Sequence, residues 1–598
     1  MKLFDIEKLV LNKYSKLDRL EQKEYLVKEV RNVLDNNLKI DMNNKDILYF
    51  IELNNNKIDN YVIKLIEDNK LNKKEIFELI EKEKYMENKK YYVTTPIYYP
   101  SANFHIGHCY TTVIADSIAR YKKLKGYDTF FLTGSDEHGL KIQKKAEEAG
   151  VTPQEYVDKI IENAKDLWKS LDIEYDRFIR TTDRDHVETV QKIFQKLYDQ
   201  GDIYKGEYKG LYCTPCESFW TETQLVDGKC PDCGRDVSEV SEEAYFFKLS
   251  KYQDKLVDYI ESHPEFIQPI SRKNEMLNNF IKPGLEDLCV SRTTFDWGVP
   301  VPFDSKHVVY VWLDALTNYI SALGYLSEDD SKFKKFWPAD LHIVGKEIVR
   351  FHTIIWPIML MALDLPLPKQ IFGHGWLVIN GGKISKSLGN YKDPREYINT
   401  YGVDAIRYYI LREVPFGSDG QFTEELLVTR YNTDLANTVG NLVNRTLSML
   451  TKYFDGIISK GSETTEFDLD LINLVKSTKD KVEDNMDKLQ IPEALDSIFD
   501  IFRRANKYID ETTPWILAKE EQNEKLKTVL YNLLESIRIG AILLTPYLPN
   551  TSKEILRQLN TKETDYDKTN EFGLLEENIH INDYKPIFMR IDDKHESK

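Results

Sequence analysis

The chain is poor in cysteine, with six among 598 residues. Four of the six lie close together, at Cys213, Cys216, Cys230 and Cys233. Cytosolic proteins seldom keep disulfides, so this cluster favours a metal site over a set of disulfide bridges. A long apolar run is also missing, because the longest, residues 354–363, contains Pro357 and is far shorter than the ~20 residues of a membrane span. The N-terminus has no signal-peptide core, so we expect a cytosolic protein that does not enter a membrane.

The first 85 residues contain no glycine, proline or cysteine, although the whole chain has 27 glycines and 21 prolines. Part of this stretch shows helical spacing of its apolar residues, as at Ile76, Phe77, Leu79 and Ile80. We therefore predict a helical N-terminal extension of unknown role over residues 1–87, or a partly ordered arm. A second hypothesis stays open, in which translation starts at Met86 and residues 1–85 come from reading the sequence upstream of the true start.

The net charge is −17 and the isoelectric point is about 5.3. A protein that coats nucleic acid without selectivity is usually basic, so this class is disfavoured. A nucleic-acid substrate is not excluded, because binding needs only a local basic surface. Composition alone therefore does not predict an RNA partner.

From residue 91 onward the sequence alternates between short apolar strands and helical segments. Strands are predicted at residues 91–99 and 127–134, and helices at about residues 107–125 and after Gly139. Strand, helix, strand, helix is typical of an α/β fold with a doubly wound parallel sheet of the Rossmann type.

The alternation breaks near Gly206, where the cysteine cluster begins, and resumes near His307. We predict a catalytic domain whose two halves, residues 88–205 and 301–422, are separated by a connective insertion over residues 206–300.

A second domain is predicted after the sheet. Helical periodicity continues over residues 423–560, and three prolines mark breaks between helices: Pro492, Pro514 and Pro546. This region is predicted to be an all-α bundle, and residues 561–598 a tail without a clear pattern.

His105-Ile106-Gly107-His108 lies between the first strand and its helix. Ligands of doubly wound sheets bind at the carboxyl ends of the strands, and a helix N-terminus there favours phosphate. Two imidazoles three residues apart can both donate to a triphosphate, and Gly107 lets a flat ring approach the backbone. The alternative is a pair of surface histidines at a helix cap.

Lys383-Ile384-Ser385-Lys386-Ser387 follows two glycines. Lys383 and Lys386 on a glycine-led loop are candidates to hold a pyrophosphate leaving group. The alternative is a solvated basic loop. Finding both motifs in this order, on the two halves of one split sheet, makes coincidence improbable.

The cysteines have the spacing of a four-thiolate zinc knuckle, with two residues inside each pair and thirteen between the pairs. Cys213 and Cys216 form the first pair, and Cys230 and Cys233 the second. We predict one structural Zn²⁺. A redox dithiol is the alternative, but it needs only one such pair.

The motifs HIGH and KISKS resemble those of class I aminoacyl-tRNA synthetases, in which the second motif usually reads KMSKS. Within that class the chain resembles the methionyl-tRNA synthetases over residues 88–560. The stretches that carry the resemblance are TTPIYYPSANFHIGH, FFLTGSDEHG, GLYCTPCESFW, YVWLDALTNYI, GKEIVRFHTIIWP, GNLVNR and TPW. The departure at Ile384 keeps an apolar side chain, although closure of the loop could differ.

The resemblance implies that the enzyme joins methionine to tRNA through a methionyl-adenylate, with Mg²⁺ accompanying ATP. His105, His108, Lys383 and Lys386 would act on the phosphates, and Gly107, Gly345, Glu347 and Lys386 would bind ATP. It also implies a methionine pocket, in which Asp136 holds the substrate ammonium. The pocket would comprise Ile97, Tyr99, Asp136, Trp312, Ala315, Tyr319, Ile348 and His352. Without the resemblance, core packing would be the simpler explanation of Trp312 and Tyr319.

In the predicted bundle, Asn437, Asn441 and Arg445 are four residues apart and would share one stripe of an α-helix. Trp515 follows Pro514 at a helix break. A stacking aromatic beside asparagine and arginine suits unpaired bases, although a capped helix and a core tryptophan would explain the pattern too. The resemblance implies that these four residues bind the CAU anticodon of initiator and elongator tRNA.

Three alternatives remain. The first is a class I synthetase for another amino acid, which the small insertion disfavours because isoleucine, valine and leucine enzymes carry a much larger editing domain there. The second is a catalytically inactive tRNA-binding paralogue, which the intact motifs disfavour. The third is a zinc-ribbon adaptor, which does not explain the split sheet. We expect a monomer, because the oligonucleotide-binding domain that dimerises some members is absent.

Overall fold

The computed structural model describes residues 89–591 apart from 216–217, 221, 223–224, 232, 380–381, 384–391, 416 and 582. The chain divides into two compact units, Met1–Lys90 and Tyr91–Lys598. The predicted N-terminal extension, Ile384, Lys386 and Cys216 all lie outside the described residues.

A six-stranded sheet forms the centre of the second unit, in the order β3-β2-β1-β12-β13-β7. The pairs β2–β3, β1–β12, β12–β13 and β13–β7 are parallel. Strands far apart in the chain thus lie side by side, which confirms the predicted split sheet. The strands are β1 (Lys90–Tyr98), β2 (Asp128–Ser135), β3 (Arg177–Arg180), β7 (Ile267–Gln268), β12 (Leu341–Gly345) and β13 (Ile371–His374).

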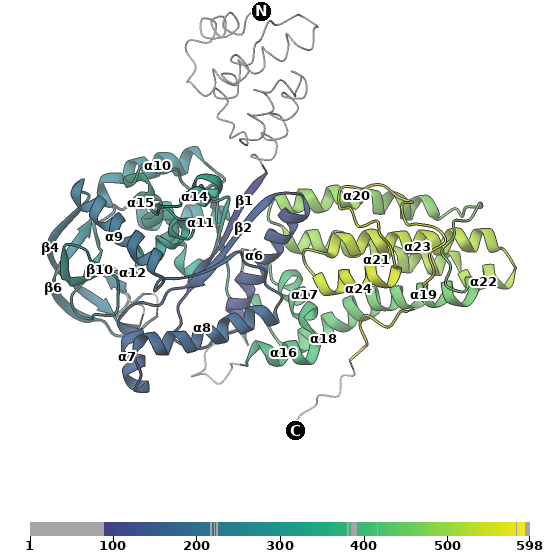
Figure 1. The fold of residues 1–598 in the computed structure, drawn as a ribbon, viewed down its shortest axis with the longest axis horizontal. Coiled ribbons are helices and arrows are strands. Elements are labelled where there is room, and N and C mark those ends of the chain that lie inside the picture. The colour runs from purple at the N-terminus through teal and green to yellow at the C-terminus, as the bar shows by residue number, and fades with distance from the viewer. Residues whose placement is uncertain are drawn as a thin grey trace, which may run out of the picture. The chain divides into compact units, whose positions relative to one another are not determined.

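The sheet is covered on both faces, and residues 129–135 of β2 are accordingly all buried. Tyr92 and Val93, neighbours on β1, belong to different core clusters because successive side chains of a strand point to opposite faces. Helices α6 and α8 pack in the cluster of Val93, and α9 and α15 in that of Tyr92 (Figure 1). The helices are α6 (Ile106–Leu124), α8 (Pro153–Ser170), α9 (Arg184–Asp199) and α15 (Trp356–Ala362).

The predicted insertion differs from expectation in two respects. Its body is a four-stranded antiparallel sheet, β5-β4-β6-β8, but β7 within it joins the edge of the central sheet. The stretch at His307, expected to resume the parallel sheet, instead forms β11 (Asp304–Val309) of a small antiparallel sheet. An apolar run shows that a strand forms but not which neighbour it pairs with. The other strands are β4 (Ile203–Cys213), β5 (Ser218–Trp220), β6 (Ser238–Phe247) and β8 (Leu288–Cys289).

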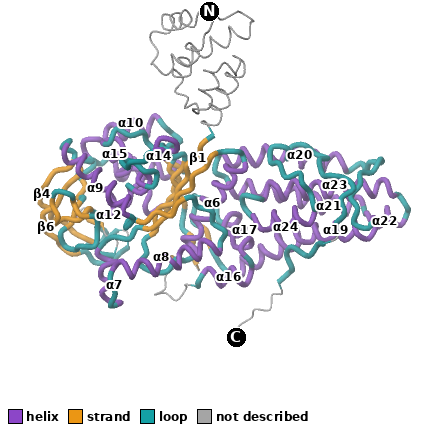
Figure 2. The backbone as a smooth tube through the Cα atoms, viewed as in Figure 1, coloured by secondary structure: helices purple, strands orange, loops and turns teal. Residues whose placement is uncertain are grey.

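The part of the chain that holds α19 to α24 is helical, as predicted (Figure 2). Pro492 and Pro514 lie in the first turns of α21 and α22. Proline is tolerated there because the N–H groups of a first turn make no hydrogen bond within the helix. Pro546 precedes α24. The helices are α16 (Pro394–Tyr401), α17 (Val403–Glu413), α18 (Glu424–Arg430), α19 (Asn441–Phe454), α20 (Asp468–Asp487), α21 (Ile491–Thr512), α22 (Pro514–Lys519), α23 (Asn523–Leu544) and α24 (Pro549–Leu559).

The stretch after α24 packs on the bundle rather than leaving it. Buried Glu535 of α23 accepts the backbone N–H groups of Gly573, Leu574 and Leu575 at 2.9 to 3.0 Å. Arg538 binds the same carboxylate at 2.7 Å and compensates its charge. Among the described residues, no helix is long and apolar enough to cross a membrane.

Candidate active site

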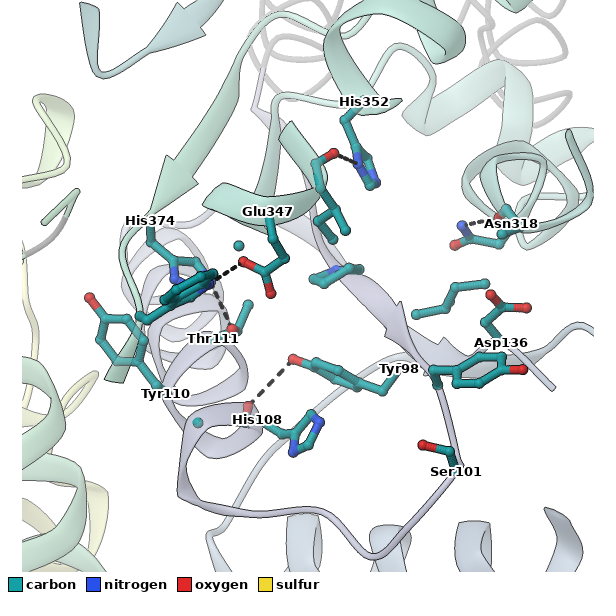
Figure 3. Close-up of a pocket in the computed structure, with 18 of the residues that line it drawn as sticks. Tyr98, Ser101, His108, Tyr110, Thr111, Asp136, Asn318, Glu347, His352 and His374 are labelled. Carbon is teal, nitrogen blue, oxygen red and sulfur yellow. Dashed lines mark hydrogen bonds between the residues drawn. The ribbon is translucent and has the colours of Figure 1, made fainter. Parts of the chain in front are cut away.

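A cavity of about 450 Å³ opens at the carboxyl ends of β1, β2, β12 and β13 (Figure 3). This is the edge at which doubly wound sheets bind their ligands. Its wall contains all eight residues of the predicted methionine pocket, together with His105, Gly107, His108, Gly345 and Glu347. The structure therefore brings these residues together around one cavity.

His105 and His108 form the start of α6. Nδ1 of His105 accepts the N–H of Gly107 at 3.1 Å, and Nδ1 of His108 accepts the N–H of His105 at 3.0 Å. Because each Nδ1 is an acceptor, the neutral form of each ring carries its proton on Nε2. These two bonds cap α6 and fix both rings, so that each presents an Nε2–H donor. Such donors at a helix N-terminus suit phosphate oxygens.

Of the second predicted motif, residues 383–387, the structure describes only the backbone of Lys383. The backbone of Lys383 forms β15 (Gly382–Lys383), which pairs with β14 (Leu377–Ile379). Leu377, in that neighbouring strand, lines the cavity. The side chain of Lys383 and the whole of Lys386 lie outside what the structure describes, so their predicted contact with the phosphates stays a prediction.

Tyr319 and His352 form a hydrogen-bonded pair in the cavity wall. Nδ1 of His352 donates to the carbonyl of Ile348 at 2.9 Å, so Nε2 accepts from the Tyr319 hydroxyl at 2.7 Å. Burial lowers the pKa of His352 to about 4 and raises that of Tyr319 well above its usual value. Both groups are therefore uncharged at neutral pH, which gives a wall that suits an uncharged side chain.

Asp136 lines the cavity, whereas the next two side chains of its loop, Glu137 and His138, bind other groups. The buried carboxylate of Glu137 is bound by Arg180 at 2.6 and 2.8 Å. His138 and His186 bind opposite oxygens of Asp314 at 2.7 and 2.8 Å. Burial alone would raise the pKa of Asp314, but the two imidazoles outweigh it and hold that pKa at about 2.

The structure adds lining residues that the sequence reasoning missed. His374 donates from Nδ1 to the carbonyl of Gly375 at 2.7 Å and accepts from Thr111 at 2.8 Å. Trp376 donates from its indole to Glu347 at 2.6 Å. Leu316, left out of the predicted pocket, also lines the cavity. One signal was available, since His374 ends β13 at the ligand edge of the sheet.

The cysteine cluster has the geometry of metal ligands. The Sγ atoms of Cys213, Cys230 and Cys233 lie within 4.8 Å of one another, with 3.5 Å between Cys213 and Cys233. A tetrahedral zinc site with ~2.3 Å bonds separates its sulfurs by ~3.8 Å, whereas a disulfide needs ~2.05 Å. The described thiols therefore fit zinc and not a bridge, while the fourth predicted ligand, Cys216, lies outside the described residues.

The predicted anticodon residues lie in the helical part of the chain, but not on one regular α-helix. Asn437 lies in a π-helix, η7 (Tyr431–Gly440), which precedes α19, so the assumption of one regular α-helix through Asn437 and Asn441 is wrong. Their shared polar stripe stays a prediction. Asn437 and Asn441 are exposed. Arg445 lies 3.7 Å from Asp510 near the end of α21, and Trp515 follows three residues after that end with 46% of its surface exposed.

A parallel split sheet with a capped histidine motif at its ligand edge and a helical second domain defines a class I aminoacyl-tRNA synthetase. The family "tRNA synthetases class I (M)" matches residues 91–240 and 235–447, and the "Anticodon binding domain of methionyl tRNA ligase" matches residues 458–598. The chain belongs to the methionyl-tRNA ligase family.

Relatives and solved structures agree with this assignment. The chain is 63% identical over 506 residues to the methionine–tRNA ligase of Caldanaerobacter subterraneus, a match that covers 84% of this chain and 79% of that one. The Clostridium acetobutylicum methionine–tRNA ligase is 61% identical over 507 residues, with 85% and 79% covered. The Mycobacterium tuberculosis methionyl-tRNA synthetase in complex with methionyl-adenylate aligns with a TM-score of 0.81 and 41% identity, over 84% of this chain and all of that one.

Proposed function

We propose that this chain is a methionine–tRNA ligase, which activates L-methionine with ATP to methionyl-adenylate and transfers methionine to the 3′ end of tRNA. One observation carries the proposal: thirteen residues that the resemblance assigns to the substrates, eight to methionine and five to ATP, line a single cavity. Family membership agrees with it.

In activation, the methionine carboxylate attacks the α-phosphorus of ATP, the α–β phosphoanhydride bond breaks, and pyrophosphate leaves. The chain supplies position and charge rather than a covalent intermediate. His105 and His108 donate to the phosphates from the start of α6, and Lys383 and Lys386 neutralise the leaving pyrophosphate. Gly345 and Glu347, at the end of β12, contact the adenosine, and Mg²⁺ accompanies the triphosphate.

Methionine is held on the opposite side of the cavity. Asp136 accepts bonds from its ammonium group, while the aromatic rings of Tyr99, Trp312 and Tyr319 surround the thioether, together with Ile97, Ala315 and Ile348. A flexible, polarisable sulfur packs well against ring edges. The neutral His352–Tyr319 pair avoids placing a charge beside it.

Cys213, Cys216, Cys230 and Cys233 would hold one Zn²⁺, which would cross-link the knuckle without a part in the reaction. The bundle binds tRNA through Asn437, Asn441, Arg445 and Trp515, which recognise the CAU anticodon of initiator and elongator tRNA. The protein acts as a monomer. A reducing, cytosolic compartment suits it, because cysteines there stay reduced and can bind a metal.

Amino-acid-dependent exchange of pyrophosphate into ATP tests the first step, with methionine compared against leucine, isoleucine, valine and glutamine. Exchange with methionine alone is the expected result, and preference for another amino acid would contradict the proposal. Charging of a CAU-anticodon tRNA, against the same tRNA with an altered anticodon, tests the second step.

A further inference from the structure

The cysteine knuckle forms part of the cavity itself. Pro215, between the two cysteines of the first pair, lines the cavity beside the predicted methionine residues. Trp220, at the end of β5, is 5% exposed and packs with Cys213 and Cys230. The knuckle therefore has both a direct edge on the cavity and a buried aromatic ring fixed to its metal-ligating residues.

Arg350 connects that ring to the cavity wall. Its guanidinium carbon lies 4.6 Å from the ring centre of Trp220 and 4.5 Å from that of Phe351. Phe351 in turn stacks on Trp312 with ring centres 3.6 Å apart and an angle of 12° between the planes. Trp312 lines the cavity, so a continuous series of four side chains runs from the knuckle to the site.

We propose that Arg350 is a positioning residue for methionine, whose guanidinium between Trp220 and Phe351 holds the Trp312 wall of the pocket against the cysteine knuckle. The inference rests on the function proposed above. A planar guanidinium stacks on aromatic faces, and the attraction grows when water is excluded. Ile348 and His352, two residues before and after Arg350, also line the cavity, so the same contact constrains this segment of backbone.

The arrangement acts on one substrate only. The four stacked side chains end at Trp312, whereas the histidines proposed for ATP are fixed separately by their own cap at the start of α6. Loss of the guanidinium frees Phe351 and Trp312 to take other rotamers, and ordering them again on binding reduces affinity. The affinity for methionine therefore falls, whereas the affinity for ATP does not change.

Arg350→Met, which keeps length and removes charge, tests this in the full chain by pyrophosphate exchange. We expect the KM for methionine to rise three- to tenfold, equivalent to about 0.7–1.4 kcal/mol. The KM for ATP, kcat and the zinc content per chain should stay within twofold of the parent, and Arg350→Lys should recover part of the affinity because it keeps a cation. Arg184→Met serves as a matched control, since Arg184 is 92% exposed and lies against no ring in the described contacts.

A methionine titration by calorimetry, without ATP, provides a readout that a general loss of fold would not reproduce. Arg350→Met and Phe351→Leu should weaken methionine binding by less together than the sum of their separate effects, because both break the same stack. An unchanged KM for methionine, equal damage to both substrates, loss of zinc, or strict additivity would overturn the proposal. Absence of methionine-dependent exchange in the unaltered chain would instead overturn the proposed function.

Discussion

At the scale of single residues, burial decides how three histidines behave: His352 and His374 of the cavity wall, and His342, which packs against Tyr319. Burial lowers the pKa of His342, His352 and His374 below the usual value. Each has a definite tautomer, because one ring nitrogen accepts a bond, from Trp356, Tyr319 and Thr111 respectively. His352 and His374 therefore line the cavity with neutral imidazoles of fixed orientation and add no charge to it.

These histidines make stability depend on pH. The unfolded chain binds a proton at His352 near pH 6.5, whereas the folded chain does so only near its pKa of about 4. Between these values the unfolded state binds more protons, so stability is full above pH 6.5 and falls as pH drops toward 4, by up to about 3 kcal/mol for this group. We expect Tm to fall between pH 7 and pH 5.

Thermal unfolding followed by circular dichroism measures this fall. His352→Gln, which has no titrating ring, should show a smaller drop over the same interval than the parent. Parallel curves for the two proteins would show that His352 does not contribute.

Lys386 gives a second prediction at this scale. Lys386→Ala should lower the rate of pyrophosphate exchange at least tenfold, equivalent to about 1.4 kcal/mol or more, because the leaving pyrophosphate loses a cation. Lys334, which is exposed and pairs with Asp330, is the matched control, and Lys334→Ala should leave exchange unchanged. Equal rates for Lys386→Ala and the parent would remove Lys386 from the mechanism.

At the scale of elements, the end of α21 and the start of α22 present Trp515. Thr513 between them adopts a left-handed conformation with φ of 42°, and Pro514 begins the next helix. This sharp break leaves Trp515 exposed, whereas the apolar face of α21 is buried. A tryptophan with 46% of its surface exposed can stack on an unpaired base, which is the ligand expected here.

Trp515→Ala should reduce kcat/KM for charging of tRNA by about 5- to 160-fold, because stacking on one base contributes about 1–3 kcal/mol. Methionine-dependent pyrophosphate exchange should not change, since it needs no tRNA. Leu469→Ala on the same bundle is the control, because Leu469 is 70% exposed. If Trp515→Ala damages both reactions equally, the residue is structural.

At the scale of the whole described molecule, one buried ion pair joins the sheet domain to the bundle. Arg407 of α17 binds Asp116 of α6 at 2.7 Å, and both side chains are fully buried. The same guanidinium donates to the carbonyls of Tyr547 at 2.9 Å and Pro546 at 3.3 Å, between α23 and α24. The helix that begins with His105 is thus bonded to the turn that closes the bundle.

Arg407→Met should lower the stability by about 3–5 kcal/mol, because it leaves Asp116 as a buried charge with less compensation. Asp116→Asn combined with Arg407→Met should be more stable than Arg407→Met alone. Thermal unfolding of the three proteins decides this, with the exposed pair of Arg184 and Glu188 as a reference that should contribute little. A higher Tm for Arg407→Met than for the double variant would contradict the argument.

The sequence by itself determined the elements and the chemistry of the motifs. Apolar periodicity predicted β1, α6 and β2, and spacing predicted the cysteine knuckle, because these depend on residues close in the chain. Only the tertiary structure decided which strands pair, as with β7 at the sheet edge and β11 outside the sheet, and which remote side chains meet, as with Arg350 and Trp220. Such contacts depend on how surfaces pack in three dimensions, and a single sequence carries no local signal of them.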